Sequence, residues 1–424
     1  MIDDNDSKLV TRRGFVAAAS GLSLVGIGAI VDNPLASKVE TNWTTNADSR
    51  HPVMLRMRGG QTLYLATENA LVAKSAKDGS EKWQFTGIGE YPFVTPRHLD
   101  DDSLLVPGEN RAFCIDTTTG SQQWQFEFTE SDTDVRPWLF DGRAYVADDE
   151  LHAISAETGT VEWTFTPSNP ISETLPTDES VYVGTKEGTV YALSADTGEE
   201  QWRFTAPGPF GRSYAELTPI DVSAPLDSTG GDQPESVYAW ARRDNRLYSI
   251  SRSDGTERWR FTSVSGNVVF PGVVTTERVY LVDGSEYLAM SSDDGSVEWK
   301  FDADGSLKWF SSVEDGTAYV HTDDELHAIE TSDGTRRWRF ELDSSQAAVV
   351  PDVGVRRMRG DDPVTSVVAL GSQSGSIRWT LDASERFESA LVGPDSVYLS
   401  TNTGTVSSVS APDSLAATIQ RTVR

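Results

Sequence analysis

The stretch SADTGEEQWRF, residues 194–204, recurs along the chain in closely similar forms. It occurs earlier as SAETGTVEWTF at 155–165, and later as SRSDGTERWRF at 251–261 and SSDDGSVEWKF at 291–301. A phrase that returns at a nearly fixed interval is the sequence signature of a repeat architecture. The period of this repeat, more than any single residue, therefore decides the fold.

Eight tryptophans mark the repeat at intervals of 41, 39, 39, 57, 40, 39 and 41 residues. Each has a glycine four positions earlier, and seven have Phe two positions later, with Leu381 at the eighth. The pairs are Gly79 and Trp83, Gly120 and Trp124, Gly159 and Trp163, Gly198 and Trp202, Gly255 and Trp259, Gly295 and Trp299, Gly334 and Trp338, and Gly375 and Trp379. We take these residues as the structural repeat motif.

One unit, residues 180–204, has the pattern of successive hairpin strands. Its runs 181–183 and 190–193 are β-branched and aromatic, and the turn signals KEG and ADTG follow them. Alternation along the closing strand puts Trp202 and Phe204 on one face. A single sheet of this kind leaves its aromatic face in water, whereas radially stacked sheets cover one another. The sequence predicts an all-β propeller of four-stranded antiparallel blades, without helix.

The motif resembles the quinoprotein-type (PQQ-like repeat) β-propeller family, whose units carry A-x-[DT]-G-x-x-x-W-x-[FW], and the resemblance covers residues 40–410. The chain is similar to the BamB-like and PQQ-binding-like β-propeller repeat proteins. This resemblance implies one of two functions: a pyrroloquinoline-quinone dehydrogenase, or a binding scaffold such as the bacterial outer-membrane assembly lipoprotein. The repeat alone does not separate them.

The resemblance also implies eight blades, closed by an N-terminal strand that pairs with C-terminal strands. The literal count is nine, because residues 396–413 form a further unit that lacks its Trp strand, and ETNWTT at 40–45 can supply that strand. We expect eight blades from the family and keep nine as the alternative. The propeller domain is expected over residues 40–413, followed by a short tail at 414–424.

The interval between Trp202 and Trp259 is unusually long. It contains residues 206–236, which are rich in Pro, Gly, Ser and Asp. Irregular insertions lie on the surface and often carry binding sites. The segment is therefore either a binding insertion or a plain solvent loop.

The N-terminus has the features of an export signal. Arg12 and Arg13 directly precede an apolar run within TRRGFVAAASGLSLVGIGAI at 11–30, which resembles a twin-arginine signal. Residues 1–36 are expected to be a signal peptide or, because NPLAS matches the A-x-A cleavage pattern poorly, an uncleaved anchor and the chain's only membrane contact. We expect export by the twin-arginine route to the cell surface or the extracellular space.

The chain is strongly acidic, with 36 basic and 65 acidic residues and a formal charge of −29. This charge excludes a nucleic-acid partner, since the field of the protein repels phosphate. The 8 Lys are outnumbered by 28 Arg, and the acids are scattered through the turns. The pattern predicts a haloarchaeal protein that stays soluble in concentrated salt, with an ordinary acidic secreted protein as the alternative. A monomer is expected.

The residues that bear chemistry are few. Cys114 is the single cysteine, so the vicinal cysteine pair expected of a quinone dehydrogenase is missing. No G-x-S-x-G, H-E-x-x-H or phosphate-binding G-x-x-x-x-G-K motif occurs. We predict no catalytic residue, cofactor or metal, with pyrroloquinoline quinone and calcium as the alternatives.

The chain has five histidines, His51, His98, His152, His321 and His327, and for the two that lie in a duplicated phrase a structural role is favoured over metal ligation. Two of them follow the acidic turns 148–150 and 323–325 in the near-duplicate phrase DDELHA, at the repeat position of Tyr191, which indicates a packing role. The acidic turns are either solvated or weak cation sites. The resulting hypothesis is an exported, non-enzymatic scaffold that binds an unknown protein or cell-surface polymer; a PQQ-dependent oxidoreductase is the alternative.

Overall fold

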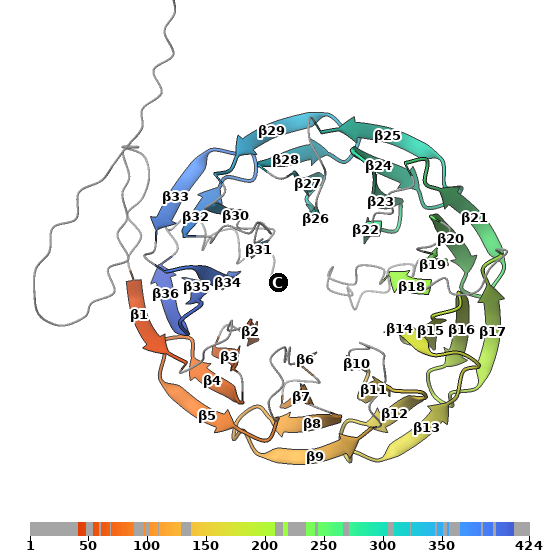
Figure 1. Cartoon of the computed structure of the whole chain (residues 1–424), viewed down its shortest axis with the longest axis horizontal. Helices are drawn as coiled ribbons and strands as arrows, with labels where there is room; N and C mark the ends of the chain where they lie inside the picture. The colour runs from red at the N-terminus through yellow and green to blue at the C-terminus, as the bar shows by residue number, and fades with distance from the viewer. Residues whose placement is uncertain are drawn as a thin grey trace, which may run out of the picture.

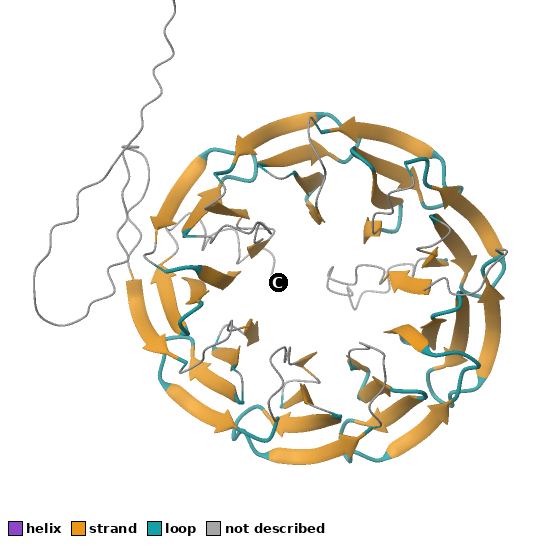
Figure 2. Cartoon of the chain, in the orientation of Figure 1, coloured by secondary structure: helices purple, strands orange, loops and turns teal. Residues whose placement is uncertain are grey.

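The computed structural model describes residues 41–410 apart from the following segments: 48–53, 59–60, 68, 89–96, 99–101, 109, 129–136, 208–214, 219–234, 242–244, 266–270, 304–308, 323, 344–345, 351–353, 356–364, 383–384 and 393–395. The predicted signal or anchor at 1–36, with Arg12 and Arg13, and the tail at 414–424 lie outside this part. All described secondary structure is β-strand (Figure 2). No helix in the described residues is long and apolar enough to cross a membrane.

The described strands form nine four-stranded sheets, arranged as blades around a central axis (Figure 1). From the centre outward, blades one to three contain β2 (Met54–Arg58), β3 (Thr62–Ala66), β4 (Leu71–Ser75) and β5 (Glu81–Phe85); β6 (Arg97–His98), β7 (Ser103–Gly108), β8 (Arg111–Asp116) and β9 (Gln122–Glu127); and β10 (Trp138–Phe140), β11 (Arg143–Ala147), β12 (Leu151–Ser155) and β13 (Val161–Phe165).

Blades four to six contain β14 (Ile171–Pro176), β15 (Ser180–Thr185), β16 (Thr189–Ser194) and β17 (Glu200–Thr205); β18 (Ala215–Thr218), β19 (Ser236–Ala241), β20 (Arg246–Ser251) and β21 (Glu257–Thr262); and β22 (Pro271–Val274), β23 (Arg278–Asp283), β24 (Glu286–Ser291) and β25 (Val297–Asp302). Blade seven contains β26 (Trp309–Glu314), β27 (Thr317–His321), β28 (Glu325–Glu330) and β29 (Arg336–Glu341).

Blade eight departs from the predicted antiparallel pattern. Its order is β31 (Gly354–Val355), β30 (Gln346–Val350), β32 (Ser366–Leu370) and β33 (Ile377–Asp382). Strand β30 pairs with β32 in parallel, with Gln346 opposite Ser366. The first strand of this blade, β30, occupies the second position instead of the innermost one. It therefore runs in the same direction as β32, whereas the second and third strands of the other blades are antiparallel.

Blade nine closes the ring with strands from both ends of the described chain. It contains β34 (Phe387–Val392), β35 (Ser396–Thr401), β36 (Thr405–Ser410) and, outermost, β1 (Thr41–Asn46). Strand β1 pairs antiparallel with β36, with Trp43 opposite Ser408. The split ninth unit is therefore confirmed, and the expectation of eight blades is wrong for the described residues. Each Trp-bearing outer strand has its own sheet, so the number of repeats fixes the number of blades.

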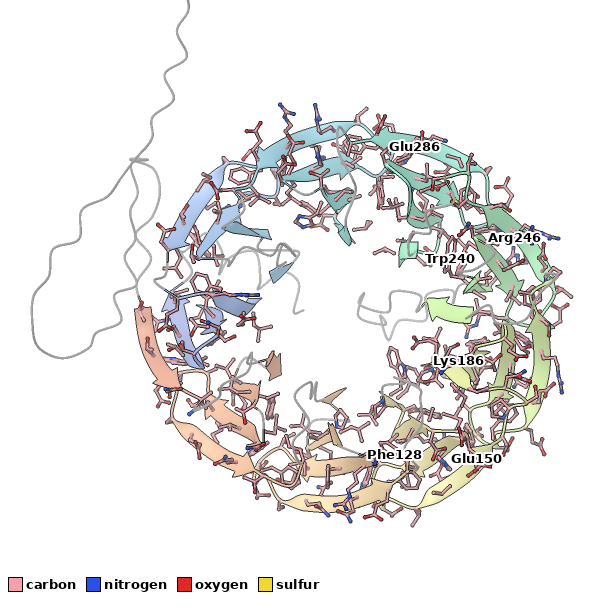
Figure 3. The ribbon with its side chains drawn as sticks, viewed as in Figure 1. Phe128, Glu150, Lys186, Trp240, Arg246 and Glu286 are labelled. Carbon is pink, nitrogen blue, oxygen red and sulfur yellow. The ribbon has the colours of Figure 1, made fainter. Side chains whose placement is uncertain are left out.

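The hydrophobic core lies between the blades, where the side chains of neighbouring sheets meet (Figure 3). One cluster joins Tyr182 and Trp202 of blade four to Val237 and Tyr248 of blade five. The next boundary holds Trp240, which is 1% exposed. The middle strands are covered on both faces, as in β15, whereas the outer strands bury little beyond their Trp. Burial on both faces explains why the middle strands have continuous apolar runs.

Candidate functional site

The outer-strand tryptophans donate a hydrogen bond to the next blade at eight of the nine boundaries between described blades, whereas Trp379 Nε1, at the ninth, has no hydrogen-bond partner in the described part. Trp202 Nε1 donates a hydrogen bond to the backbone carbonyl oxygen of Arg252 in the next blade, at 2.8 Å. The ring of Trp202 covers Gly255, where φ is +72° and a Cβ atom would lie 2.6 Å from the ring. Equivalent hydrogen bonds join Trp43 to Ala76, Trp83 to Thr117, Trp124 to Ala156, Trp163 to Ala195, Trp259 to Ser292, Trp299 to Thr331 and Trp338 to Ser372. The predicted burial of the motif tryptophans on the fourth strands is confirmed.

The two histidines of the duplicated phrase pack against the Phe of the preceding blade. The ring centroids of Phe126 and His152 are 5.1 Å apart, and those of Phe301 and His327 are 5.4 Å apart. Tyr191 packs on Phe165 in the same way, at 5.2 Å. The packing interpretation of these histidines is thus confirmed. His321 is buried in β27, while His51 and the side chain of His98 lie outside the described part.

Cys114 and the acidic turn at 148–150, the groups that bear on a quinone or a calcium ion, make contacts within the chain. Cys114 is fully buried within a blade boundary, with its Sγ atom 3.1 Å from Gln123 Oε1. Nowhere in the described part do three or more His, Cys, Asp or Glu side chains gather as a metal site. In the acidic turn at 148–150, Asp148 Oδ1 accepts a hydrogen bond from the backbone N–H of Glu150 at 2.8 Å. The second acidic turn is described only from Asp324 onward.

The predicted insertion at 206–236 is not one continuous surface loop. Within it, β18 forms the innermost strand of blade five and pairs with β19. The insertion is therefore a blade strand flanked by two connections, of which 208–214 and 219–234 lie outside the described residues. The connection from Thr218 to Ser236 is long compared with that from Pro176 to Ser180 in blade four. Its described end is Glu235, which lines a groove.

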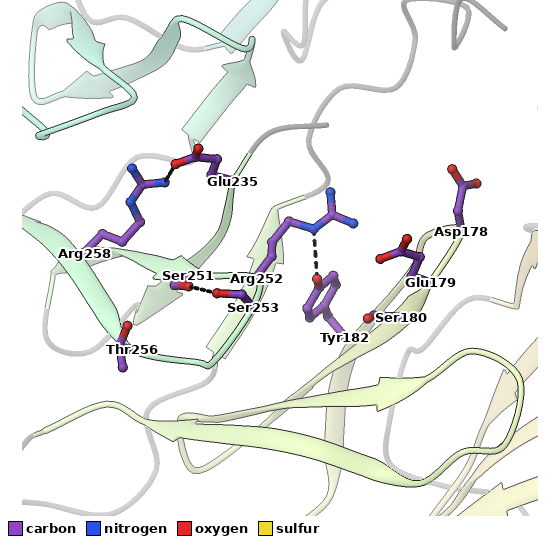
Figure 4. Close-up of a pocket in the computed structure, with 10 residues that line it drawn as sticks. All are labelled: Asp178, Glu179, Ser180, Tyr182, Glu235, Ser251, Arg252, Ser253, Thr256 and Arg258. Atoms are coloured by element: carbon purple, nitrogen blue, oxygen red, sulfur yellow. Dashed lines mark hydrogen bonds and ion pairs between the residues drawn. The ribbon is translucent and has the colours of Figure 1, made fainter. Parts of the chain in front are cut away.

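This groove, which we call the inter-blade groove, lies between blades four and five and has a volume of about 690 Å³ (Figure 4). One wall comes from the β14–β15 turn and β15, and the other from the end of the long connection, the β20–β21 turn and β21. Its lining residues are Asp178, Glu179, Ser180, Tyr182, Glu235, Ser251, Arg252, Ser253, Thr256 and Arg258. The lining thus combines three carboxylates, two guanidinium groups and several hydroxyl groups.

Arg252 is the main departure from the repeat in this groove. The same position, three residues before the motif glycine, carries a small side chain in the other turns: Ala76, Thr117, Ala156, Ala195, Ser292, Thr331 and Ser372. The fold uses only the backbone carbonyl here, as the acceptor for Trp202 Nε1. The side chain is therefore not fixed by the repeat.

The guanidinium group of Arg252 extends across the boundary onto blade four (Figure 4). Its Nε atom donates to the hydroxyl oxygen of Tyr182 at 3.0 Å, and Nη2 donates to Thr177 Oγ1 at 3.4 Å. Tyr182 is itself held under Trp202, with ring centroids 5.8 Å apart. These contacts hold the guanidinium group in a defined orientation within the groove.

A second arginine ties the long connection to the outer strand. Arg258 Nη1 lies 2.8 Å from Glu235 Oε2 and donates to Ser236 Oγ at 3.3 Å. The turn beside it is fixed by Asp254, whose Oδ1 accepts from Thr256 Oγ1 at 2.8 Å and from the Thr256 backbone N–H at 3.1 Å. The hydrogen bond from the Thr256 side chain is the main cause that lowers the pKa of Asp254. The ionised Asp254 carboxylate therefore stabilises the β20–β21 turn, which forms part of this wall.

Sequence reasoning found the insertion but missed Arg252, Arg258 and Tyr182. The missed signal is the phrase SRSDG at 251–255, where the neighbouring repeat has SADTG at 194–198. An arginine at a position that otherwise holds only small residues can be recognised from the aligned repeats. The propeller prediction places blades four and five side by side, but the repeat does not show that the β14–β15 turn with Asp178 and Glu179 faces the β20–β21 turn, so this partner wall was missed.

The fold and its motif define a PQQ-like repeat β-propeller, as the sequence predicted. A family model described as "Outer membrane protein assembly factor BamB" matches residues 108–220 and 243–365, just over half of the chain. The chain belongs to this family. A comparison with curated protein sequences finds no match.

Solved structures share the fold at low sequence identity. BamB from Moraxella catarrhalis is 13% identical, with a TM-score of 0.53 over 88% of this chain and 100% of that one. The computationally designed Ika8 protein is 11% identical, with a TM-score of 0.55 over 88% and 99% of the two chains. Quinohemoprotein alcohol dehydrogenase from Comamonas testosteroni is 11% identical, with a TM-score of 0.52 over 89% and 76%. At this identity the likeness concerns the fold alone.

Proposed function

We propose that this protein is an exported, non-enzymatic β-propeller that acts as a monomeric scaffold and binds a partner protein or a cell-surface polymer. The observation that carries the proposal is the meeting of two departures from the repeat at the inter-blade groove: the long connection and Arg252. Repeated positions are set by the fold, whereas residues free of that constraint can serve binding. Function is therefore assigned to this one boundary.

Family membership supports a scaffold role, because the family takes its description from an assembly factor. That description also refers to an outer membrane, which supports a place beyond the cytoplasmic membrane. Arg12 and Arg13 support export by the twin-arginine route. The groove lining includes neither histidine nor cysteine, which favours binding over nucleophilic catalysis.

The proposal is tested by affinity capture from cell-surface fractions in concentrated salt. Immobilised wild type is compared with Arg252→Ala, which places in blade five the residue that Ala156 and Ala195 hold in other turns, so the fold is preserved. Ser292→Ala, the same repeat position in blade six, is the matched control. Wild type and Ser292→Ala should retain a common component that Arg252→Ala releases. Equal retention by all three, or no retention by the wild type, contradicts the proposal.

A further inference from the structure

The two walls of the inter-blade groove carry different charge. The blade-four wall presents the carboxylates of Asp178 and Glu179, which are exposed and form no ion pair within the described part of the chain. The opposite wall presents the guanidinium group of Arg252, oriented by Tyr182 and Thr177. Opposite charges at a fixed separation select a ligand that carries both signs.

The lining disfavours several classes of ligand. Tyr182 is 1% exposed, so the described lining of the groove offers no aromatic face on which a sugar ring or a nucleobase can stack. A polyanion is repelled by the net charge of −29 and by the carboxylates at the groove. An apolar ligand finds mainly charged groups and hydroxyls there.

An extended polypeptide matches this lining. Its backbone presents N–H donors, and the hydroxyl oxygens of Ser253 and Thr256, which are bonded to Ser251 and Asp254, keep lone pairs that can accept from them. A basic side chain can lie against Asp178 and Glu179, while an acidic side chain accepts from the Arg252 guanidinium. The groove runs between two blades that are joined by the Trp202 hydrogen bond and a shared hydrophobic cluster, which favours binding without rearrangement of the scaffold.

We infer that the inter-blade groove binds an extended segment of a partner protein in which a basic residue lies beside an acidic one. This inference rests on the scaffold function proposed above, and it identifies the partner as a protein and the recognised feature as a pair of opposite charges. The guanidinium group of Arg252 binds the acidic residue of the segment. The carboxylates of Asp178 and Glu179 bind its basic residue.

The test is a selection from a random dodecapeptide display library on the full chain. Peptides bound by the wild type should be enriched in adjacent basic and acidic residues relative to the input. The Arg252→Ala protein should lose the acidic preference, and Asp178→Asn with Glu179→Gln should lose the basic one. A selected peptide should bind Arg252→Ala at least about tenfold more weakly than wild type. Ser292→Ala is the control and should select as the wild type does.

Three results overturn the inference: no enrichment of opposite-charge pairs, the same enrichment with Arg252→Ala, or binding of an arrayed neutral oligosaccharide that depends on Arg252. A component captured from the cell surface in an Arg252-dependent way, without peptide enrichment, refutes the inference and leaves the scaffold function standing. Failed capture combined with Arg252-dependent enrichment refutes the scaffold function and leaves the groove chemistry standing.

Discussion

At the scale of residues, the repeat motif acts between neighbouring units. The sequence shows Gly198 four residues before Trp202, which suggests that the two belong together. In the structure Gly198 lies under Trp163, while Trp202 reaches forward to Gly255. The identity of the motif residues could be predicted from spacing alone. Their partners could not, because a period of fixed length does not say which unit a side chain contacts.

The close approach of Gly255 to Trp202 predicts a specific cost of substitution. Gly142 is a matched control, since its φ is +73° but no atom lies within 4 Å of an added Cβ. Gly142→Ala should cost about 1–2 kcal/mol of unfolding free energy for the left-handed backbone alone. Gly255→Ala should cost about 1–3 kcal/mol more because the Cβ displaces the indole ring. Denaturant unfolding measures both, and equal costs would refute the contact.

Asp283 predicts a pH dependence. Burial raises its pKa, but hydrogen bonds from Ser263 Oγ at 2.6 Å, Ser265 Oγ at 2.5 Å and the Val264 N–H at 3.0 Å outweigh burial, so the pKa is lowered. A carboxyl whose pKa is lower in the folded state stabilises that state above its unfolded pKa, and the effect is lost as pH falls.

The melting temperature of the wild type should accordingly exceed that of Asp283→Asn at neutral pH. The difference should shrink as pH is lowered from about 6 to about 3, through the range in which this carboxyl titrates. Thermal unfolding monitored by circular dichroism at several pH values measures it. A difference that stays constant over this range would show that the ionised form of Asp283 contributes nothing.

At the scale of elements, the ring depends on a strand that is distant in sequence from its partner. Strand β1 pairs with β36, and Trp43 Nε1 donates to the Ala76 carbonyl oxygen at 3.1 Å. This closure was predictable because the last unit lacks a Trp strand and ETNWTT supplies one. The parallel pairing of β30 in blade eight was not, since apolar β-branched runs such as those of β30 and β32 do not encode strand direction.

Removal of residues 1–46 should therefore open the ring at blade nine without removing any other blade. The truncated chain should melt at a lower temperature and be cleaved by protease faster than the full chain. A synthetic peptide of residues 40–47 added in trans should restore part of the loss, because it refills the edge of β36, whereas the same peptide with Trp43→Ala should not. Unchanged melting after truncation contradicts this role of β1.

At the scale of the whole molecule, the repeat count fixed the ring at nine described blades, and the family's usual eight misled. The full chain carries a net charge of −29. The groove itself could be predicted only in part: the long interval pointed to blade five, but the spacing of the repeat does not show which turn of the neighbouring blade four faces it. The net charge predicts how stability depends on salt, and the groove predicts where a partner binds.

Salt should stabilise the folded ring. The distance over which charges repel falls from about 10 Å at 0.1 M salt to about 3 Å at 1 M. The melting temperature should rise between these KCl concentrations, since the folded chain concentrates negative charge. Changing the exposed turn residues Asp149, Glu157 and Glu199 to Lys should flatten the slope. A melting temperature independent of salt would refute the halophilic interpretation and leave the fold untouched.

Export should depend on the arginine pair. Replacing Arg12 and Arg13 together by Lys keeps the charge but removes the guanidinium groups that define the twin-arginine signal. We expect the precursor to accumulate in the cytoplasm, measured by fractionation and immunoblotting. Single replacements give the graded control. Normal secretion of the double variant would contradict export by this route.

The most direct test of the central claim is site-specific photo-crosslinking of the protein in its native cells. A photoreactive side chain is placed at Thr256, in the inter-blade groove, and at Thr160, which also follows a motif glycine but lies in blade three. The account predicts a discrete crosslinked adduct from position 256 and none from position 160. Equal adducts at both positions, or an adduct at 160 alone, would contradict the assignment of binding to the groove.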